Sequence, residues 1–169
     1  MRVYVASTPA RLATLRVQGL PAGTEGYAAT PGLAEVLGLP ADGGPDTAEE
    51  LGEAVLEAAA EASLLLLAQE PGAGELDAEG RAGRTGARRR VVVVVEARAR
   101  AVQDADHPAT VVLTAPLRWS AVESVLADDA TAVERVGRAA VLARTDQDRA
   151  VGRLERDQLG WFGPDELDD

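Results

Sequence analysis

The chain has 169 residues, of which 46% are hydrophobic and 3% aromatic, and its formal net charge is −11 with its one histidine neutral. This length suits a single domain, residues 1–169, that buries a core without disulfides or a structural metal, and the negative charge disfavours nucleic acid and anionic membranes as partners. Cysteine and lysine are absent, which excludes thiolate zinc sites, thiol nucleophiles, Schiff-base lysines and a P-loop lysine.

The first segment is expected to be a strand centred on Val3 to Val5, followed by a helix. Thr8 and Pro9 begin the helix, because a hydroxyl oxygen accepts hydrogen bonds from the free N–H groups and proline suits the first helical position. Gly19 is a typical helix end. Residues 1–6 have no signal-peptide pattern, and no apolar run approaches the about 20 residues of a membrane span. We therefore expect a cytoplasmic protein.

Residues 28–41 repeat the pattern of residues 6–22, with a Thr-Pro helix start at Thr30 and the letters Gly-Leu-Pro-Ala at the helix end. If the two preceding strands are parallel, Ser7, Thr8 and Thr30 lie at the same edge of one sheet. Helix N-termini at such an edge attract anions, so these residues are candidates for binding a small anionic ligand. The alternative is that they only cap their helices.

The best helix of the chain is expected over residues 47–69, because its apolar residues recur at the helical period and its glutamates occupy the opposite side. Residues 70–87 are rich in Gly, Ala and Glu and show no periodicity. They are expected to form a flexible loop within the domain.

The second half alternates short strands and helices. Five consecutive valines, residues 91–95, indicate a strand buried on both faces. Residues 99–109 are expected to be a polar loop. Further strands are expected over 110–117, 121–127 and 159–162, and helices over 130–142 and 146–158. A helix is a close rival for residues 121–127, and we favour a strand because Asp128 and Asp129 then cap the next helix.

The element order is therefore β-α-β-α-β, followed by a less regular ββαβ half. This order predicts an α/β (α+β) domain with a single mixed β-sheet and helices packed on it. If the first strands are parallel, the connections between them are right-handed crossovers.

His107 is a weak candidate for a catalytic acid or base, or for a metal ligand, because Asp104 and Asp106 precede it. The alternative is an exposed loop histidine beside solvated acids. No nucleophile elbow, Rossmann fingerprint, Walker motif or zinc spacing accompanies it. We therefore expect no cofactor and no metal site, and the sequence favours a protein that is not an enzyme.

Two further groups of residues are candidates for contacts with a partner. Arg88, Arg89 and Arg90, with Arg81 and Arg84, form the one basic cluster, which is interpreted as a phosphate site or as a solvated flank that protects the valine strand from aggregation. The interaction candidates are the aromatic residues Trp119, Trp161 and Phe162, because such side chains anchor interfaces; core packing is the alternative.

Several segments together resemble an uncharacterised family of small actinobacterial cytosolic proteins, a domain of unknown function. They are Met1 to Thr8, Ala29-Thr30-Pro31, the helix end Ala62-Ser63-Leu64-Leu65, the Arg-Arg-Val-Val-Val strand, Leu159-Gly160-Trp161-Phe162 and Pro164-Asp165-Glu166-Leu167. The resemblance spans nearly the whole chain and implies a bacterial cytosolic origin. It implies no activity and no functional residues.

The function expected from the sequence is a non-enzymatic binding or protein-interaction domain, with an unknown protein as its partner. The alternative is an enzyme or sensor for a small anionic ligand that uses the sheet edge at Thr8 and Thr30. A ligand site predicts a concave pocket at the helix starts, whereas a partner domain predicts an exposed apolar patch.

Overall fold

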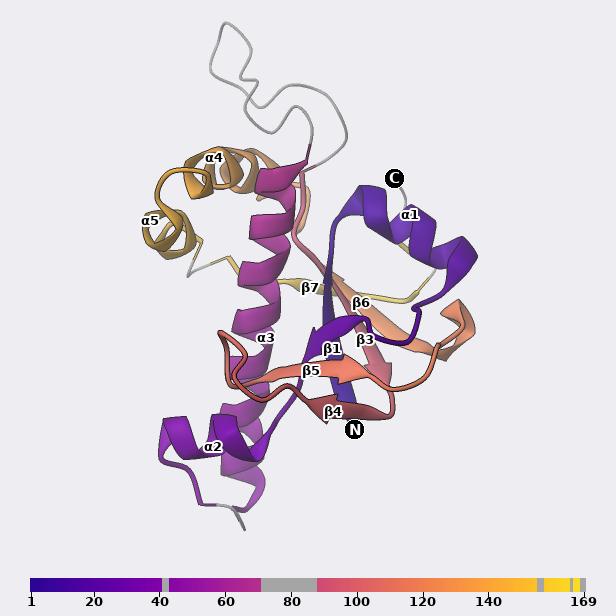
Figure 1. Cartoon of the computed structure of the whole chain (residues 1–169). Helices are drawn as coiled ribbons and strands as arrows, with labels where there is room; N and C mark the ends of the chain where they lie inside the picture. The colour runs from indigo at the N-terminus through magenta and orange to yellow at the C-terminus, as the bar shows by residue number, and fades with distance from the viewer. Residues whose placement is uncertain (41–42, 71–87, 155–156, 165, 168–169) are drawn as a thin grey trace, which may run out of the picture.

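In the described part of the chain, seven strands pair into one sheet in the order β4-β5-β2-β1-β3-β6-β7, and five α-helices pack on the sheet or on one another (Figure 1). The structure is a computed structural model that describes residues 1–40, 43–70, 88–154, 157–164 and 166–167. The helices are α1 (Pro9–Gln18), α2 (Pro31–Leu37), α3 (Pro45–Gln69), α4 (Val133–Ala143) and α5 (Gln147–Gly152), with a short 3-10 turn η1 (Trp119–Ala121). The strands are β1 (Arg2–Ser7), β2 (Glu25–Tyr27), β3 (Val91–Glu96), β4 (Ala99–Ala101), β5 (Thr110–Leu113), β6 (Val122–Ala127) and β7 (Gly160–Phe162).

The single sheet covered by helices confirms the predicted architecture, but the parallel arrangement considered for the first strands is not found. Every pairing of the described strands is antiparallel, and β1 runs opposite to β2 with Tyr4 facing Tyr27. The direction of β2 follows from its longer ladder with β5, in which three residue pairs are in register. The helix α1 therefore does not form a right-handed crossover between parallel strands.

The valine strand β3 separates two apolar layers. Val91, Val93 and Val95 face the layer beneath α1, whereas Val92 and Val94 face α3. All five valines are 2% exposed or less, which confirms the prediction of a strand buried on both faces. The helices α4 and α5 pack against α3 through Leu64 and Leu67 rather than against the sheet.

The helix starts predicted from Thr-Pro are confirmed. Thr8 and Thr30 are the N-caps of α1 and α2, and each hydroxyl oxygen accepts a hydrogen bond from a backbone N–H three residues later. The long helix α3 and the strand β6 also agree with the sequence. The predicted loop over residues 99–109 contains the short edge strand β4, which was missed. The predicted loop over residues 70–87 lies outside the described residues apart from Glu70.

Candidate functional site

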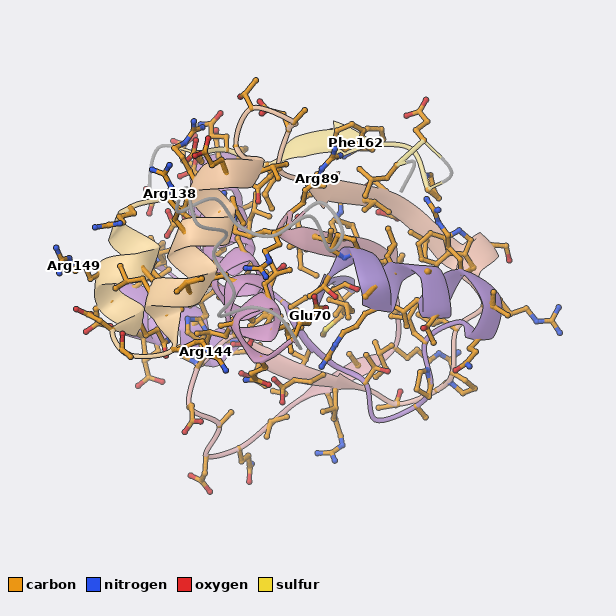
Figure 2. The ribbon with its side chains drawn as sticks, turned by 90° about the horizontal axis from the view of Figure 1, so that it is seen from above. Glu70, Arg89, Arg138, Arg144, Arg149 and Phe162 are labelled. Atoms are coloured by element: carbon orange, nitrogen blue, oxygen red, sulfur yellow. The ribbon has the colours of Figure 1, made fainter. Side chains whose placement is uncertain are left out.

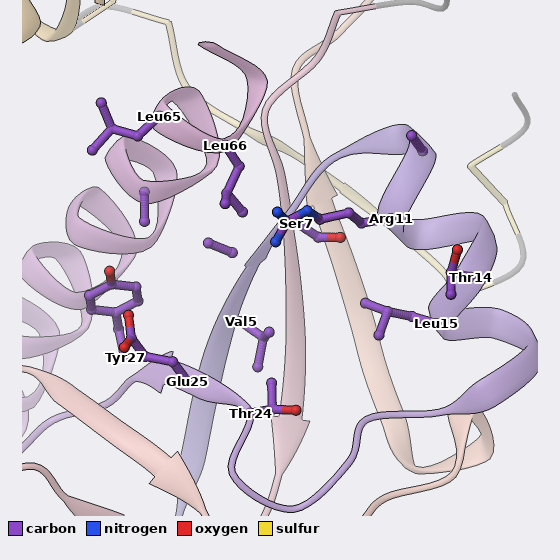
Figure 3. Close-up of a pocket in the computed structure, with 13 residues that line it drawn as sticks. Val5, Ser7, Arg11, Thr14, Leu15, Thr24, Glu25, Tyr27, Leu65 and Leu66 are labelled. Atoms are coloured by element: carbon purple, nitrogen blue, oxygen red, sulfur yellow. The ribbon is translucent and has the colours of Figure 1, made fainter. Parts of the chain in front are cut away.

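A cleft of about 700 Å³ opens between α1 and α3 (Figure 3). Strand β1 forms its floor, α1 forms one wall and α3 forms the other. Its lining residues are Val5, Ala6, Ser7, Ala10, Arg11, Thr14, Leu15, Thr24, Glu25, Tyr27, Ala62, Leu65 and Leu66. Pockets of this size hold small ligands or short peptide segments.

The cleft exists because β1 and β2 separate after they cross. Six residues of β1 are in register with β3, but only Tyr4 is in register with β2. The crossing point is at Gly26, where an added Cβ atom would lie 2.7 Å from Cγ1 of Val3. The absence of a side chain at Gly26 therefore lets β2 lie close to β1 at one point. Beyond it the strands diverge, and the gap between them becomes the floor of the cleft.

The phase of the β-ladder shows which backbone groups face this gap. Met1 and Ala97 exchange two backbone hydrogen bonds of 2.9 Å each. In an antiparallel ladder such pairs alternate with pairs whose N–H and C=O groups point to the opposite side. The β1–β3 ladder has no register shift, so Tyr4 and Ala6 direct their backbone groups away from β3. Tyr4 meets Tyr27 there, whereas Ala6 has no residue of β2 in register. The N–H and C=O of Ala6 therefore face the cleft.

The α3 wall is apolar. Ala62, Leu65 and Leu66 are half-buried and line the cleft, while the opposite side of the same helix packs on α4 and α5. Tyr27 closes the lower end of this wall. Burial raises the pKa of the Tyr27 phenol, and the nearby carboxylates of Glu25 and Glu61 raise it further. The phenol is therefore neutral at physiological pH.

The α1 wall carries the positive charge of the cleft. Figure 3 shows the Arg11 side chain reaching from α1 toward Ser7 of β1. Arg11 is exposed, and its guanidinium forms no hydrogen bond or ion pair with the described part of the chain. Beside it, the Thr8 hydroxyl donates to Oε1 of Glu70 and accepts from the backbone N–H of Arg11. The charge of Arg11 is thus available to a ligand.

Ser63 holds the upper ends of β1 and β3 together beneath the cleft. Its hydroxyl is fully buried, donates to the carbonyl of Ser7 at 2.7 Å and accepts from the N–H of Val91 at 2.8 Å. These are the last residues of the β1–β3 ladder to be in register. A side chain of α3 therefore satisfies backbone groups at the point where the two strands separate.

The comparisons with known proteins identify the family. Over residues 1–169 the sequence matches the model described as Family of unknown function (DUF6912). The chain belongs to the DUF6912 family. No curated protein and no solved structure matches it. This match confirms the prediction from the sequence that the chain is a domain of unknown function.

The candidate anion-binding residues of the DUF6912 chain do not share one sheet edge. Because β1 and β2 are antiparallel, Thr8 and Thr30 follow opposite ends of the sheet. Ser7 and Thr8 lie beside the cleft, whereas the Thr30 hydroxyl donates to the carbonyl of Pro108 at 2.6 Å. The cleft lies at the start of α1, and no residue of α2 is among its lining residues.

His107 lies near Thr30 and is not one of the residues that line the cleft, although it contacts the lining residue Tyr27. Its Nδ1 accepts a hydrogen bond from the backbone N–H of Ala109, and its ring contacts Tyr27 edge-on with centroids 5.9 Å apart. No group of three His, Asp or Glu side chains suited to a metal occurs within the described residues. No helix in the described part of the chain is long and apolar enough to cross a membrane.

The aromatic candidates differ in their exposure. Trp119 and Phe162 are half-buried and pack against the core beneath α1, and the guanidinium of Arg16 lies 5.9 Å from the Trp119 ring. Trp161 is 67% exposed on the edge strand β7. Of these three residues, only Trp161 presents most of its surface to solvent.

The interpretation of the basic cluster as a solvated flank is wrong for two of its residues. Arg88 and Arg90 are buried, and Arg90 forms an ion pair with Asp128, whose carboxylate is fully buried. The sequence could not reveal this pairing because the partners flank two different strands and are 38 positions apart. Arg81 and Arg84 lie outside the described residues.

Other arginines lie on the surface of the helical layer. Seen from above, Arg138, Arg144 and Arg149 surround α4 and α5, whereas Glu70 lies toward the first turn of α1 (Figure 2). Arg138 pairs with Glu134 one helical turn away. The positive side chain in the cleft is therefore separate from this surface group.

Proposed function

We propose that this DUF6912 chain is a non-enzymatic binding domain whose binding site is the cleft between α1 and α3. The observation that carries the proposal is the opening between β1 and β2, which leaves the backbone of Ala6 facing a space of about 700 Å³. An apolar wall and an unpaired guanidinium flank this space. Sites of this kind combine apolar surface with a few polar groups that orient the ligand.

The positions of the chemically reactive side chains favour binding over catalysis. The Nδ1 atom of His107 accepts a hydrogen bond from the backbone of Ala109, and its side chain does not line the cleft. Among the hydroxyl groups that line the cleft, that of Thr24 donates to the carbonyl of Pro21 at 2.7 Å, and Ser7 is fully buried. The hydroxyl groups of Thr8 and Ser63 beside the cleft are committed to structural hydrogen bonds. A nucleophile needs a base within hydrogen-bond reach. The carboxylate among the lining residues, that of Glu25, forms no hydrogen bond with a lining hydroxyl in the described part of the chain.

The origin and location of the protein are part of the same proposal. The resemblance stated above and the cysteine-free, lysine-free composition support a cytoplasmic protein of an actinobacterium. The binding partner of such a domain is a cytoplasmic protein or metabolite. The exposed Trp161 remains a second candidate contact, on a different edge of the sheet.

Two tryptophan substitutions on the same helix test the proposal. Thr14 is exposed on α1 and lines the cleft, whereas its neighbour Ala13 is equally exposed and does not. Isotope-labelled protein is titrated with a set of short acetylated peptides and small carboxylic acids, and amide chemical shifts are recorded. We expect shifts at Ala6 and Ser7 in the wild type and in Ala13→Trp, and their loss in Thr14→Trp.

The control separates cleft binding from an effect on folding. Both variants add the same side chain to one helix, so equal unfolding midpoints with unequal binding identify the cleft as the site. Binding that persists in Thr14→Trp, or shifts confined to the surroundings of Trp161, would disprove the cleft as the binding site.

A further inference from the structure

We infer that the occupant of the cleft is an extended peptide segment of a partner protein, which pairs antiparallel with β1 at Ala6 and places an acidic side chain beside Arg11. This inference rests on the proposed function. It names the class of ligand and the order of its side chains.

The backbone of β1 offers the first half of a β-ladder. The N–H and C=O of Ala6 face the gap where β2 is out of register. An extended peptide that enters this gap gives both groups a partner, as a strand of the sheet would. A small acid would satisfy the N–H at most, because a carboxylate only accepts hydrogen bonds. We take the antiparallel direction because it matches the rest of the sheet and is the more stable pairing.

The two walls set the order of the side chains in the peptide. The side chain of Ala6 lies on the α3 side of the sheet, because its partner Val92 packs in the layer with Ala59 of α3. Residues directly opposite each other in a ladder share a face. The peptide residue opposite Ala6 therefore faces Leu65 and Leu66, and an apolar side chain fits there.

The preceding residue of the peptide lies opposite Ser7 and faces the α1 wall. Figure 3 shows that Arg11 reaches toward Ser7 from this wall, so an acidic side chain at this position meets the guanidinium. The protein as a whole carries a net charge of −11, and Glu25 lies at the lower end of the cleft. A peptide with several acidic residues is therefore repelled, and the site selects one acidic residue followed by an apolar one.

The probe is the peptide acetyl-Val-Glu-Val-amide, whose second valine is placed opposite Ala6, so that the peptide ends before the crossing of β2 at Gly26. Three control peptides change one feature each: glutamine in place of glutamate, lysine in place of glutamate, and an N-methyl group on the second valine. The N-methyl group removes the N–H that would donate to the carbonyl of Ala6. A small acid with the same apolar group, 3-methylbutanoate, is titrated in parallel.

Binding is measured from the amide shifts of Ala6 and Ser7 at millimolar probe. We expect the parent peptide to bind. The glutamine peptide is expected to bind about threefold more weakly, because an exposed ion pair is lost. The N-methyl peptide is expected to bind about tenfold more weakly, because a hydrogen bond is lost and the carbonyl of Ala6 is left unpaired. In the variant Arg11→Glu we expect the order of affinities to reverse, so that the lysine peptide binds more tightly than the glutamine and glutamate peptides. A glutamate in the first helical turn suits α1, so this variant folds.

Several outcomes separate failure of the inference from failure of the proposed function. The inference is overturned if the parent and N-methyl peptides bind equally well. It is also overturned if 3-methylbutanoate shifts the amides of Ala6 and Ser7 and the peptides do not. Both outcomes leave the cleft as a binding site. A dimer in sedimentation that Thr14→Trp abolishes and Ala13→Trp retains overturns it in favour of a second copy of the chain. No shift of Ala6 or Ser7 with any probe overturns both.

Discussion

Arg90 and Asp128 form a buried ion pair that joins β3 to β6. Nη2 of Arg90 lies 2.7 Å from Oδ1 of Asp128, and the backbone N–H of Arg90 donates to Oδ2 at the same distance. A further bond of 2.7 Å from the guanidinium to the carbonyl of Asp157 reaches the segment before β7. One side chain therefore fixes three parts of the chain relative to one another.

Removal of the buried carboxylate is expected to destabilise the fold strongly. Asp128→Asn leaves the Arg90 charge buried without an anion, which lowers the free energy of unfolding by about 3–5 kcal/mol. Urea denaturation measures the loss. The control is Arg138→Ala, which breaks the exposed pair with Glu134, in which both side chains are more than half exposed; we expect it to cost less than about 1 kcal/mol. Equal losses in the two variants would contradict the role assigned to Asp128.

Two buried serines are expected to respond in opposite ways to the same substitution. Ser63→Ala leaves the carbonyl of Ser7 and the N–H of Val91 without their partner, so we expect a loss of about 1–3 kcal/mol. The hydroxyl of Ser124 is fully buried and has no hydrogen-bond partner within the described residues. Ser124→Ala removes an unsatisfied group and is expected to change stability by no more than about 1 kcal/mol, toward greater stability. A stabilised Ser63→Ala protein would refute the bridging role.

Substitution of two glycines by alanine is expected to change the stability of the protein in opposite directions. At Gly26 the new Cβ meets Val3 at 2.7 Å and the carbonyl oxygen of Tyr4 at 3.1 Å, and we expect overpacking to cost about 1–3 kcal/mol. Gly52 lies inside α3 with nothing within 4 Å. Gly52→Ala is expected to stabilise the protein by about 0.5–1 kcal/mol, because alanine is the better helix former. Thermal unfolding of both variants measures the two effects. An unchanged unfolding midpoint in Gly26→Ala would rule out the close crossing of β1 and β2.

The raised pKa of Tyr27 predicts a loss of stability at alkaline pH. Burial and the carboxylates of Glu25 and Glu61 make ionisation of the phenol harder in the folded state. A group whose folded pKa is raised contributes its full stability below the unfolded pKa, and loses it as pH rises through the folded pKa. We therefore expect the stability of the wild type to fall above about pH 10 more steeply than that of Tyr27→Phe. Parallel pH curves for the two proteins would contradict the assignment.

Local sequence signals predicted the elements well. The Thr-Pro starts at Thr8 and Thr30, the periodicity of α3 and the valines of β3 each specify one element through neighbouring residues alone. The strand β4 was missed because it has only three residues, Ala99–Ala101, and alternates a small alanine, which is uncommon in strands, with a charged side chain at the edge of the sheet.

The long-range relationships could not be predicted in this way. The direction of β2 depends on its ladder with β5, which no local pattern encodes. The partner of Arg90 is a residue 38 positions away, and a charged triplet before a strand is usually solvated. The cleft follows from the single registered pair between β1 and β2, so Arg11 and Thr14 gave no signal as site residues. Ser7 and Thr8, predicted as ligand-binding residues at an edge shared with Thr30, lie beside the cleft, although that shared edge does not exist.

The β1–β3 ladder joins residues at the start of the chain to residues beyond its middle, with Arg2 facing Glu96 and Ser7 facing Val91. During translation the first strand leaves the ribosome well before its main neighbour has been synthesised, and β2 offers it one residue pair in the meantime. The backbone groups of β1 that face β3 therefore stay without their ladder partners until β3 emerges. The sheet assembles late and through distant segments, which is the condition under which a nascent chain folds slowly and depends on chaperones.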